Sequence, residues 1–222
     1  MSDTLIVGAT GHRNLHAGGV SQLRRRVRAF LADIARHLPQ TELRLMIGMA
    51  HGADLLVARA ALRAGWKIDA ALPLPLERHL EDFDTKTVSE LRAVLADPAV
   101  TCTVLSAPGG ANLDARHGAG RSVFYDNLTQ ALIERTHLLL ALWDGKPSSR
   151  PGGTADTVRR YLEVRSRFVY WIPTQRSDAV DRASQAPRYL SGSGDTVHDH
   201  GSVMPQALEQ QLRSLLHLRS GP

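Results

Sequence analysis

The chain has one cysteine, Cys102, among its 222 residues. A single thiol excludes an internal disulfide and a cysteine-rich zinc site, and its place in an expected strand favours an inert thiol in the core. No window approaches the ~20 consecutive apolar residues that a membrane-spanning helix needs. The first expected strand begins at Thr4, which leaves no room for a secretory signal peptide. We therefore expect a cytoplasmic protein without a membrane partner.

Aromatic residues are also scarce, at 5% of the chain. Lysine and arginine outnumber aspartate and glutamate by 27 to 22, a formal net charge of +5, and a run of arginines lies between Arg24 and Arg28. Such a run is typical of a solvated helix face. Single-strand binding surfaces usually combine a dense basic stripe with aromatic side chains. The composition therefore disfavours nucleic acid as a partner.

Apolar runs alternate with amphipathic stretches over the first three quarters of the chain. The runs predict strands at 5–7, 43–47, 67–72, 100–105, 138–143 and 168–172, and the amphipathic stretches predict helices at 20–38, 53–64, 87–96, 122–135 and 155–165. This alternation favours a parallel sheet with helices on both faces. We predict an α/β fold of the Rossmann-like, three-layer α/β/α type, with a mostly parallel sheet of about six strands.

This domain is expected to occupy residues 1–173. Residues 174–202 are polar and lack periodicity, so we predict a flexible segment there. Residues 203–222 are expected to hold a C-terminal amphipathic helix, because apolar residues recur at helical spacing over 205–218. That helix would pack on the domain or on a second subunit.

Glycine-rich loops follow three of the expected strands. In a parallel sheet such loops meet at one edge, where ligands bind near the point at which the strand order reverses. The first loop, G-A-T-G-H-R at residues 8–13, supplies Gly8, Thr10, Gly11, His12 and Arg13 as candidate ligand contacts. Glycines let backbone amides approach a ligand, and the planar fork of arginine suits a phosphate. The loop lacks the third glycine of the dinucleotide fingerprint, and a tight turn beside a surface arginine is the alternative.

The second loop, G-M-A-H-G-A-D at residues 48–54, supplies Gly48, Gly52 and Asp54 as candidate contacts. Asp54 falls in the first turn of the next helix, where the helix dipole favours a carboxylate even without a ligand. His51 is a ligand contact, a proton donor or, as the favoured alternative, an exposed loop histidine.

The third loop, D-G-K-P-S-S-R-P-G-G-T, spans residues 144–154 and supplies Asp144, Gly145, Gly152, Gly153 and Thr154. Thr154 suits the N-cap of the next helix, and free amides at a helix N-terminus bind anions well. Asp156, in the first helical turn, would oppose a phosphate placed directly on that end. Either the phosphate contacts the glycine amides while Asp144 or Asp156 takes ribose hydroxyls, or Asp156 only satisfies the helix end.

A longer loop at residues 106–121 has the length of a lid or binding loop, with disorder as the alternative. Arg121 and Tyr125 lie four residues apart at the start of the following helix, so they can share one face and join the candidate contacts. The histidines match no metal-ligand spacing. We expect neither a metal ion nor a cofactor.

Four segments together resemble the SLOG superfamily of Rossmann-like domains, which is related to the lonely-guy phosphoribohydrolases and to DNA-processing protein A. They are T-G-H-R (10–13), G-M-A-H-G-A-D (48–54), L-L-A-L-W-D-G-K-P (139–147) and P-G-G-T-A-D-T-V (151–158). The resemblance covers residues 4–173. It implies binding of nucleotides or nucleotide-derived ligands, which some members sense in defence against phage. Relatives often pair, so a homodimer is expected.

The chain departs from its enzymatic relatives at one position. They carry P-G-G-x-G-T-x-x-E, in which the glutamate serves N-glycosidic cleavage, and counting from the threonine places Thr157 there. Nucleoside deoxyribosyltransferases, which the chain also resembles, place a nucleophilic glutamate at the same point. A hydroxyl is a poor substitute for a carboxylate that stabilises an oxocarbenium-like centre. If catalysis survives, Asp156 and Asp54 are the candidate catalytic residues.

The leading hypothesis is a non-catalytic or weakly catalytic domain that binds or senses a nucleotide-type small molecule. The first alternative is an N-glycoside hydrolase or transferase acting on nucleoside monophosphates. The second is a DNA-associated scaffold.

Overall fold

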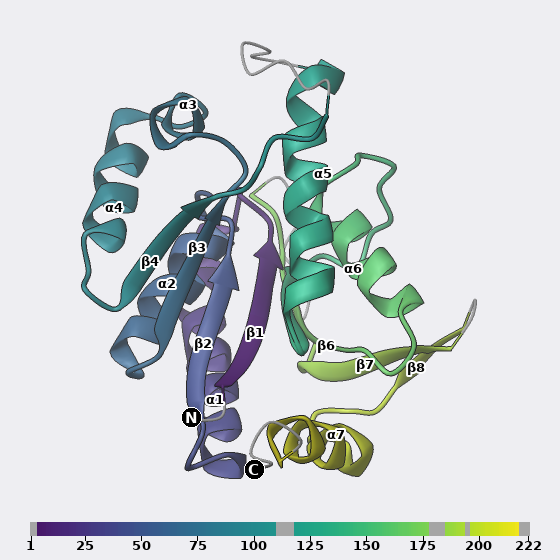
Figure 1. Ribbon diagram of the computed structural model, residues 1–222. Helices are drawn as coiled ribbons and strands as arrows, with labels where there is room; N and C mark the ends of the chain where they lie inside the picture. The colour runs from purple at the N-terminus through teal and green to yellow at the C-terminus, as the bar shows by residue number, and fades with distance from the viewer. Residues whose placement is uncertain (1–3, 110–117, 178–184, 194–195, 218–222) are drawn as a thin grey trace.

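The computed structural model describes residues 4–109, 118–177, 185–193 and 196–217, and its central feature is an eight-stranded sheet with helices on both faces (Figure 1). The strand order is β4-β3-β2-β1-β5-β6-β7-β8. Strands β1 to β6 pair in parallel, and β7 and β8 pair antiparallel. The predicted Rossmann-like α/β class is confirmed, and the sheet has eight strands where about six were expected.

The strands are β1 (Thr4–Gly11), β2 (Glu42–Ile47), β3 (Lys67–Leu72), β4 (Val100–Val104), β5 (Leu138–Trp143), β6 (Phe168–Pro173), β7 (Arg188–Ser193) and β8 (Thr196–Asp199). The helices are α1 (Val20–His37), α2 (Ala53–Arg63), α3 (Leu76–Leu80), α4 (Thr85–Leu95), α5 (Gly118–Arg135), α6 (Thr154–Glu163) and α7 (Gln206–His217), with a 3-10 turn, η1 (Ala17–Gly19), before α1. The five-residue helix α3 follows Pro75 and has too few turns for a periodic signal.

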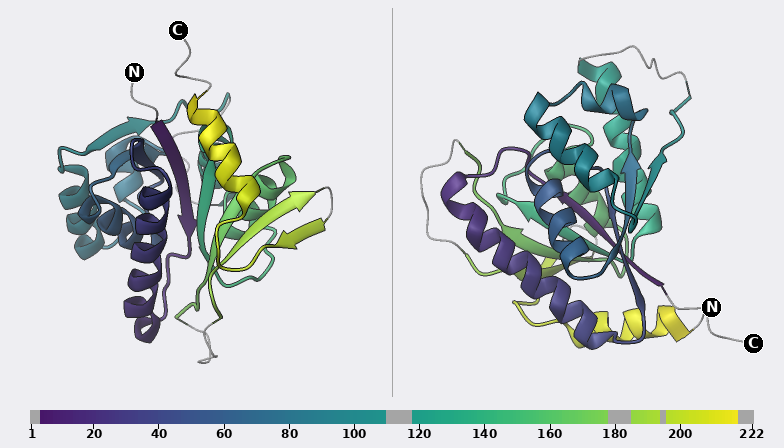
Figure 2. Two further views of the ribbon diagram at one scale, coloured as in Figure 1. Left: turned by 90° about the horizontal axis from the view of Figure 1, so that it is seen from below. Right: turned by 90° about the vertical axis from the view of Figure 1, so that its left-hand side faces the viewer.

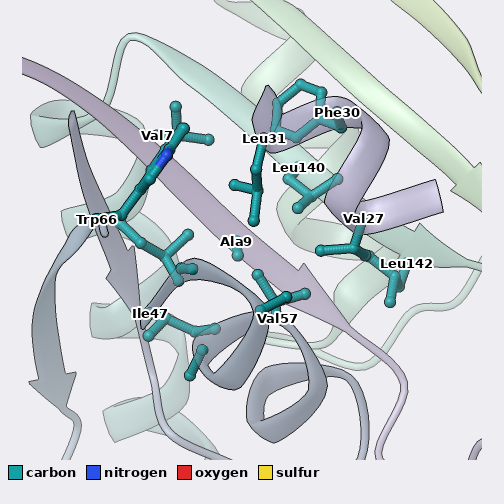
Figure 3. Close-up of a cluster of buried hydrophobic side chains, with 14 of the residues drawn as sticks. Val7, Ala9, Val27, Phe30, Leu31, Ile47, Val57, Trp66, Leu140 and Leu142 are labelled. Carbon is teal, nitrogen blue, oxygen red and sulfur yellow. The ribbon is translucent and has the colours of Figure 1, made fainter. Parts of the chain in front are cut away.

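Apolar stripes on the helices produce the three layers. Helices α1, α2, α4 and α7 pack on one face of the sheet, and α5 and α6 cover the other (Figures 1 and 2). In α1, Val27, Phe30 and Leu31 fall three or four residues apart, so they share the face that meets β1 and β5 (Figure 3). Val7 and Leu140 of those strands lie fully buried against them.

Strand β1 is longer than the expected residues 5–7, because the chain stays extended through Gly8 to Gly11. Gly8 is paired with Met46 on one side and Leu139 on the other. It is therefore a buried strand residue and not part of the loop in which it was expected.

The predicted flexible segment, residues 174–202, holds β7 and β8, which extend the sheet beyond β6. Tyr189 and Leu190 of β7 are buried, and the Tyr189 ring lies 4.6 Å from that of Tyr170 on β6. Two apolar residues are too few to show a periodic pattern in the sequence. The strand was therefore not predicted, because its burial depends on pairing with β6. The predicted terminal helix corresponds to α7, whose Leu208 and Leu212 pack into the main core.

Cys102 lies on the exposed edge strand β4 and is exposed, so the expected buried thiol is wrong. The alternating Val and Thr residues of this strand reflect an edge position, where only one side of the strand is paired. None of the described helices has the length and apolar character required to cross a membrane.

Gly192 tests whether β7 is an integral part of the fold. A Cβ atom at this position would lie 1.9 Å from the carbonyl oxygen of Leu162, at the end of α6. We expect Gly192→Ala to lower the free energy of unfolding by about 1–3 kcal/mol, because backbone must move to admit the methyl group. Gly19→Ala is the matched control, since it meets no atom within 4 Å and should cost less than about 1 kcal/mol. Equal effects of the two variants in urea unfolding would contradict this packing.

Candidate functional site

A cleft of about 800 Å³ opens at the carboxyl edge of the sheet, where β1 and β5 lie side by side. The chain leaves β1 toward α1 on one face and leaves β5 toward α6 on the opposite face (Figure 1). No crossover therefore covers the space between the two strand ends, which is the usual ligand position in open α/β sheets.

The cleft brings together most of the predicted site residues from all three glycine loops and from α5. Its lining includes Thr10, Gly11, His12, Arg13, Gly48, Asp54, Arg121, Tyr125, Asp144, Gly152, Gly153 and Thr154. Four predicted residues lie outside the lining, namely Gly8, Gly52, Gly145 and Asp156.

His12 joins the loops to one another. Its backbone N–H donates to the Leu142 carbonyl at 3.1 Å, and its own carbonyl accepts from the Ala53 N–H at 3.1 Å. The N–H of Asp144 donates to His12 Nε2 at 3.0 Å, and the Asp144 carboxylate lies 3.1 Å from the same nitrogen. One residue thus ties the end of β1 to the end of β5 and to the start of α2.

Gly52 shapes the cleft without lining it. Its φ is +79°, and a Cβ atom there would lie 2.0 Å from the Arg13 carbonyl oxygen, so only glycine lets the two loops approach this closely. Met49 also has a positive φ, of +55°, which is uncommon for a residue with a side chain. The Nε2 atom of His79 donates to the Met49 carbonyl at 2.9 Å and stabilises the turn between β2 and α2.

Arg13 is held between two aromatic rings. Its guanidinium carbon lies 5.2 Å from the ring centroid of Phe83 and 5.2 Å from that of Tyr125. The Tyr125 hydroxyl donates to Asp82, and Arg121 bonds the same carboxylate at 2.9 Å. As predicted, Arg121 and Tyr125 share one face of α5, and both anchor on Asp82. This network fixes one aromatic wall around the guanidinium, whose planar fork suits a bidentate anion.

Asp54 is the buried acid of the cleft. Its carboxylate accepts from the Ala50 N–H at 2.9 Å. Burial raises the pKa of Asp54 to about 7, although the Ala50 hydrogen bond and the charge of Arg13 act to lower it. Asp54 therefore titrates close to neutral pH inside the cleft, in contrast to a carboxylate that only satisfies a helix end.

The third loop uses its glycine amides internally. The Gly152 N–H donates to the Asp156 carboxylate at 3.1 Å, and the Gly153 N–H donates to the Arg150 carbonyl at 3.2 Å. Burial would raise the pKa of Asp156, but the Arg159 side chain and the Gly152 N–H bind its charged form and leave the pKa lowered. Asp156 therefore organises the loop and the first turn of α6.

Thr157, at the position of the hydrolase glutamate, lines the floor of the cleft. Its hydroxyl lies 2.8 Å from that of Thr129 and donates to the Gly153 carbonyl at 3.1 Å. The hydroxyl is thus engaged within the protein and has no neighbouring base among these contacts.

Several lining residues were not predicted, and two of them, Asp82 and Arg176, reach the cleft through tertiary contacts. Asp82 follows α3, a helix that carried no signal. Arg176 reaches the cleft because residues 14–16 pair antiparallel with 175–177, through a Leu15–Arg176 bridge and a His16 N–H to Gln175 carbonyl bond of 3.0 Å. Lys146 and Arg150 lie in the third loop, from which only Asp144, Thr154 and the glycines were predicted as contacts.

Part of the predicted lid loop, 110–117, lies outside the described residues. Within the described ranges, no group of three or more His, Cys, Asp or Glu side chains is placed to hold a metal ion.

The chain matches no protein-family model and no curated protein. Its likeness to solved structures is one of fold. The structure of DNA processing protein A from Streptococcus pneumoniae is 18% identical with a TM-score of 0.50, and the match covers 97% of this chain and 56% of that one. A structure described by the single-stranded DNA binding mode of DNA processing protein A from Helicobacter pylori is 15% identical with a TM-score of 0.47, over 81% of this chain and 69% of that one.

The fold is therefore that of DNA processing protein A, and the predicted resemblance is confirmed at this level. This chain spans little more than half of the pneumococcal protein. The match contradicts the expectation that nucleic acid is disfavoured as a partner, because the shared fold belongs to a DNA-processing protein. That expectation was based on the lack of one continuous basic stripe, whereas Arg13, the third-loop residues Lys146 and Arg150, and Arg176 reach the cleft from three separate segments.

Asp54 makes stability depend on pH in a defined direction. Its pKa is about 7 in the folded chain against an ordinary 3.8, so between these values the folded state holds a proton that the unfolded state has lost. Its contribution to the free energy of unfolding therefore falls as pH rises, by up to about 1.4 kcal/mol per unit, and levels off above about pH 8. Asp54→Asn should remove this slope. The free energy of unfolding of the variant should therefore rise relative to that of the wild type between pH 5 and pH 7.

Urea unfolding at pH 5, 6, 7 and 8 measures this difference. Asp84→Asn is the matched control, because hydrogen bonds from Thr87 lower the pKa of Asp84 and its contribution is constant over this range. A constant offset for both variants would show that Asp54 ionises normally.

Proposed function

We propose that the cleft binds a phosphate-bearing nucleotide unit. The observation that carries this proposal is the convergence of Arg13 and the N-terminus of α6 on one cleft of about 800 Å³. A nucleotide offers an anionic phosphate, hydroxyl donors and a flat base. The lining has cations, carboxylate acceptors and aromatic rings to match these groups.

The phosphate is assigned to the start of α6. Thr154 and Ala155 line the cleft, and N–H groups in the first turn of a helix have no intrahelical acceptor. The N-cap, Gly153, provides no side-chain hydrogen bond. Asp156, the acidic residue of the first turn, is bonded by the Gly152 N–H and by Arg159, which offsets its repulsion of an anion. Lys146 and Arg150, exposed on the preceding loop, add positive charge.

The remaining groups suit the rest of a nucleotide. Arg13, flanked by Phe83 and Tyr125, can meet a second phosphate oxygen pair with its fork. Asp144 is an acceptor for sugar hydroxyls beside His12. Asp54 is largely neutral below pH 7, which reduces its repulsion of a bound phosphate.

We propose binding and not glycosidic cleavage. The Thr157 hydroxyl is engaged by Thr129 and Gly153, and Asp156 is held by Gly152 and Arg159 outside the lining. Of the two candidate acids only Asp54 lines the cleft, and an oxocarbenium-like centre needs a second carboxylate or an activated water opposite the acid. The lining carboxylates Asp144 and Asp82 are held by other side chains, Asp144 by His12 and Asp82 by Arg121 and Tyr125.

Calorimetric titration with thymidine 5′-monophosphate tests this proposal. We expect Arg13→Ala to weaken binding about tenfold or more, because a charge-assisted hydrogen bond is lost. Arg25→Ala, which removes an exposed arginine of α1 that does not line the cleft, should leave the affinity unchanged. Thymidine without phosphate should bind at least about tenfold more weakly than the monophosphate. Equal binding of both compounds, or equal effects of both variants, would sink the proposal.

We further propose that single-stranded DNA supplies the nucleotide unit. Two observations favour this source: the fold is shared with DNA processing protein A, and Lys146, Arg150 and Arg176 are exposed where further phosphates would leave the cleft. Three exposed cations are more than the single phosphate of a mononucleotide requires, and they suit the several phosphates of a strand.

Salt dependence separates the two sources. Each phosphate neutralised on a single strand contributes about −0.7 to the slope of log K against log salt. Between 50 and 300 mM salt, the slope of log K against log salt should therefore be at least about twice as steep for a twelve-nucleotide thymidine strand as for the monophosphate. A strand that binds no more tightly and with the same slope would leave the free nucleotide as the ligand.

A further inference from the structure

Two tryptophans stand together beside the cleft, at the ends of β5 and β6. Trp171 is paired with Ala141, two residues before Trp143, so both indoles project toward the face covered by α6. Their ring centroids lie 5.9 Å apart at an angle of 51°. Trp143 lines the cleft, and both rings are half-buried. We call this pair the tryptophan shelf.

Internal hydrogen bonds fix the orientation of the shelf. The indole N–H of Trp143 donates to the Lys146 carbonyl at 3.0 Å, and the indole N–H of Trp171 donates to the Trp143 carbonyl at 2.9 Å. Gly145 packs against the Trp171 ring, where a Cβ atom would lie 3.1 Å from Cζ2. Both donors are used inside the protein, so the accessible part of the shelf is aromatic carbon and suits a flat, apolar ligand surface.

Basic side chains lie on the segments next to the shelf. Lys146 is exposed on the loop that follows Trp143, and Arg150 is exposed further along it. The guanidinium of Arg188 lies 5.9 Å from the Trp171 ring centroid and pairs with Asp199. Aromatic rings with basic side chains beside them, continuous with a phosphate-binding cleft, match the chemistry of successive nucleotides in a single strand.

We infer that the tryptophan shelf is a second base subsite, on which the base next to the cleft-bound nucleotide stacks. The ligand is then a single-stranded nucleic acid of at least two nucleotides. This inference rests on the proposed function, and it explains why half-buried tryptophans with satisfied donors stand at the rim of the cleft.

Intrinsic fluorescence reports on the shelf directly. The chain has three tryptophans, and the third, Trp66, is 2% exposed in the core. Titration of the full chain with thymidine 5′-monophosphate, the dinucleotide TpT carrying a 5′-phosphate, and the same dinucleotide with an abasic second position should give stronger quenching for TpT than for the other two. We expect TpT to bind about five- to a hundredfold more tightly than the abasic form.

Two variants complete the test. Trp143→Leu should reduce the ratio of TpT affinity to abasic affinity toward one, whereas Trp143→Phe, which keeps a ring, should retain most of it. A thermal melt of each variant confirms folding, and Trp171→Leu provides a second variant if Trp143→Leu does not fold. Equal affinity and quenching for TpT and its abasic form, with monophosphate binding that still depends on Arg13, would overturn the shelf and leave the cleft intact. Absence of binding by all three compounds would overturn both.

Discussion

β1 and β5 pair in parallel, but the chain continues from β1 to α1 on one face of the sheet and from β5 to α6 on the other. The cleft lies between these two diverging connections. The loops after β1 and β5 need hydrogen bonds between them to keep a fixed separation. His12 provides the tie, because its backbone and ring bond Leu142, Ala53 and Asp144. Arg13 then follows directly on a residue held from three sides, so its guanidinium is presented from a fixed backbone to the space between the strands.

Most of the first six strands were predictable because they carry a compact apolar run, such as Leu138 to Trp143, buried in a parallel sheet. The edge strand β4 is exposed and was indicated by its alternating Val and Thr residues. Strand β7 had no comparable signal. Its Tyr189 and Leu190 are buried by Tyr170 and by the end of α6, residues that only the fold brings near. The extent of β1 was missed for a related reason, since glycines at 8 and 11 read as a turn although both are paired within the strand.

Glycine patterns indicated the loops that line the cleft, but not the interactions within those loops. Gly152 and Gly153 looked like amide donors for a ligand, yet Asp156 and the Arg150 carbonyl accept both hydrogens. The setting of Arg13 depends on Phe83 and on Tyr125, which lies more than a hundred positions away in the chain. Such contacts arise from packing between elements, and no local sequence pattern encodes them.

The antiparallel pair β7–β8 also protects its neighbour. Strand β6 has the sequence F-V-Y-W-I-P and pairs with β7 from Phe168 to Trp171. A shortened chain ending near Pro173 would leave those backbone groups open on an apolar, aromatic edge, which is a template for association between molecules. The polar stretch that was predicted to be flexible thus covers this edge of the sheet, and a shortened chain that keeps the cleft has to retain it.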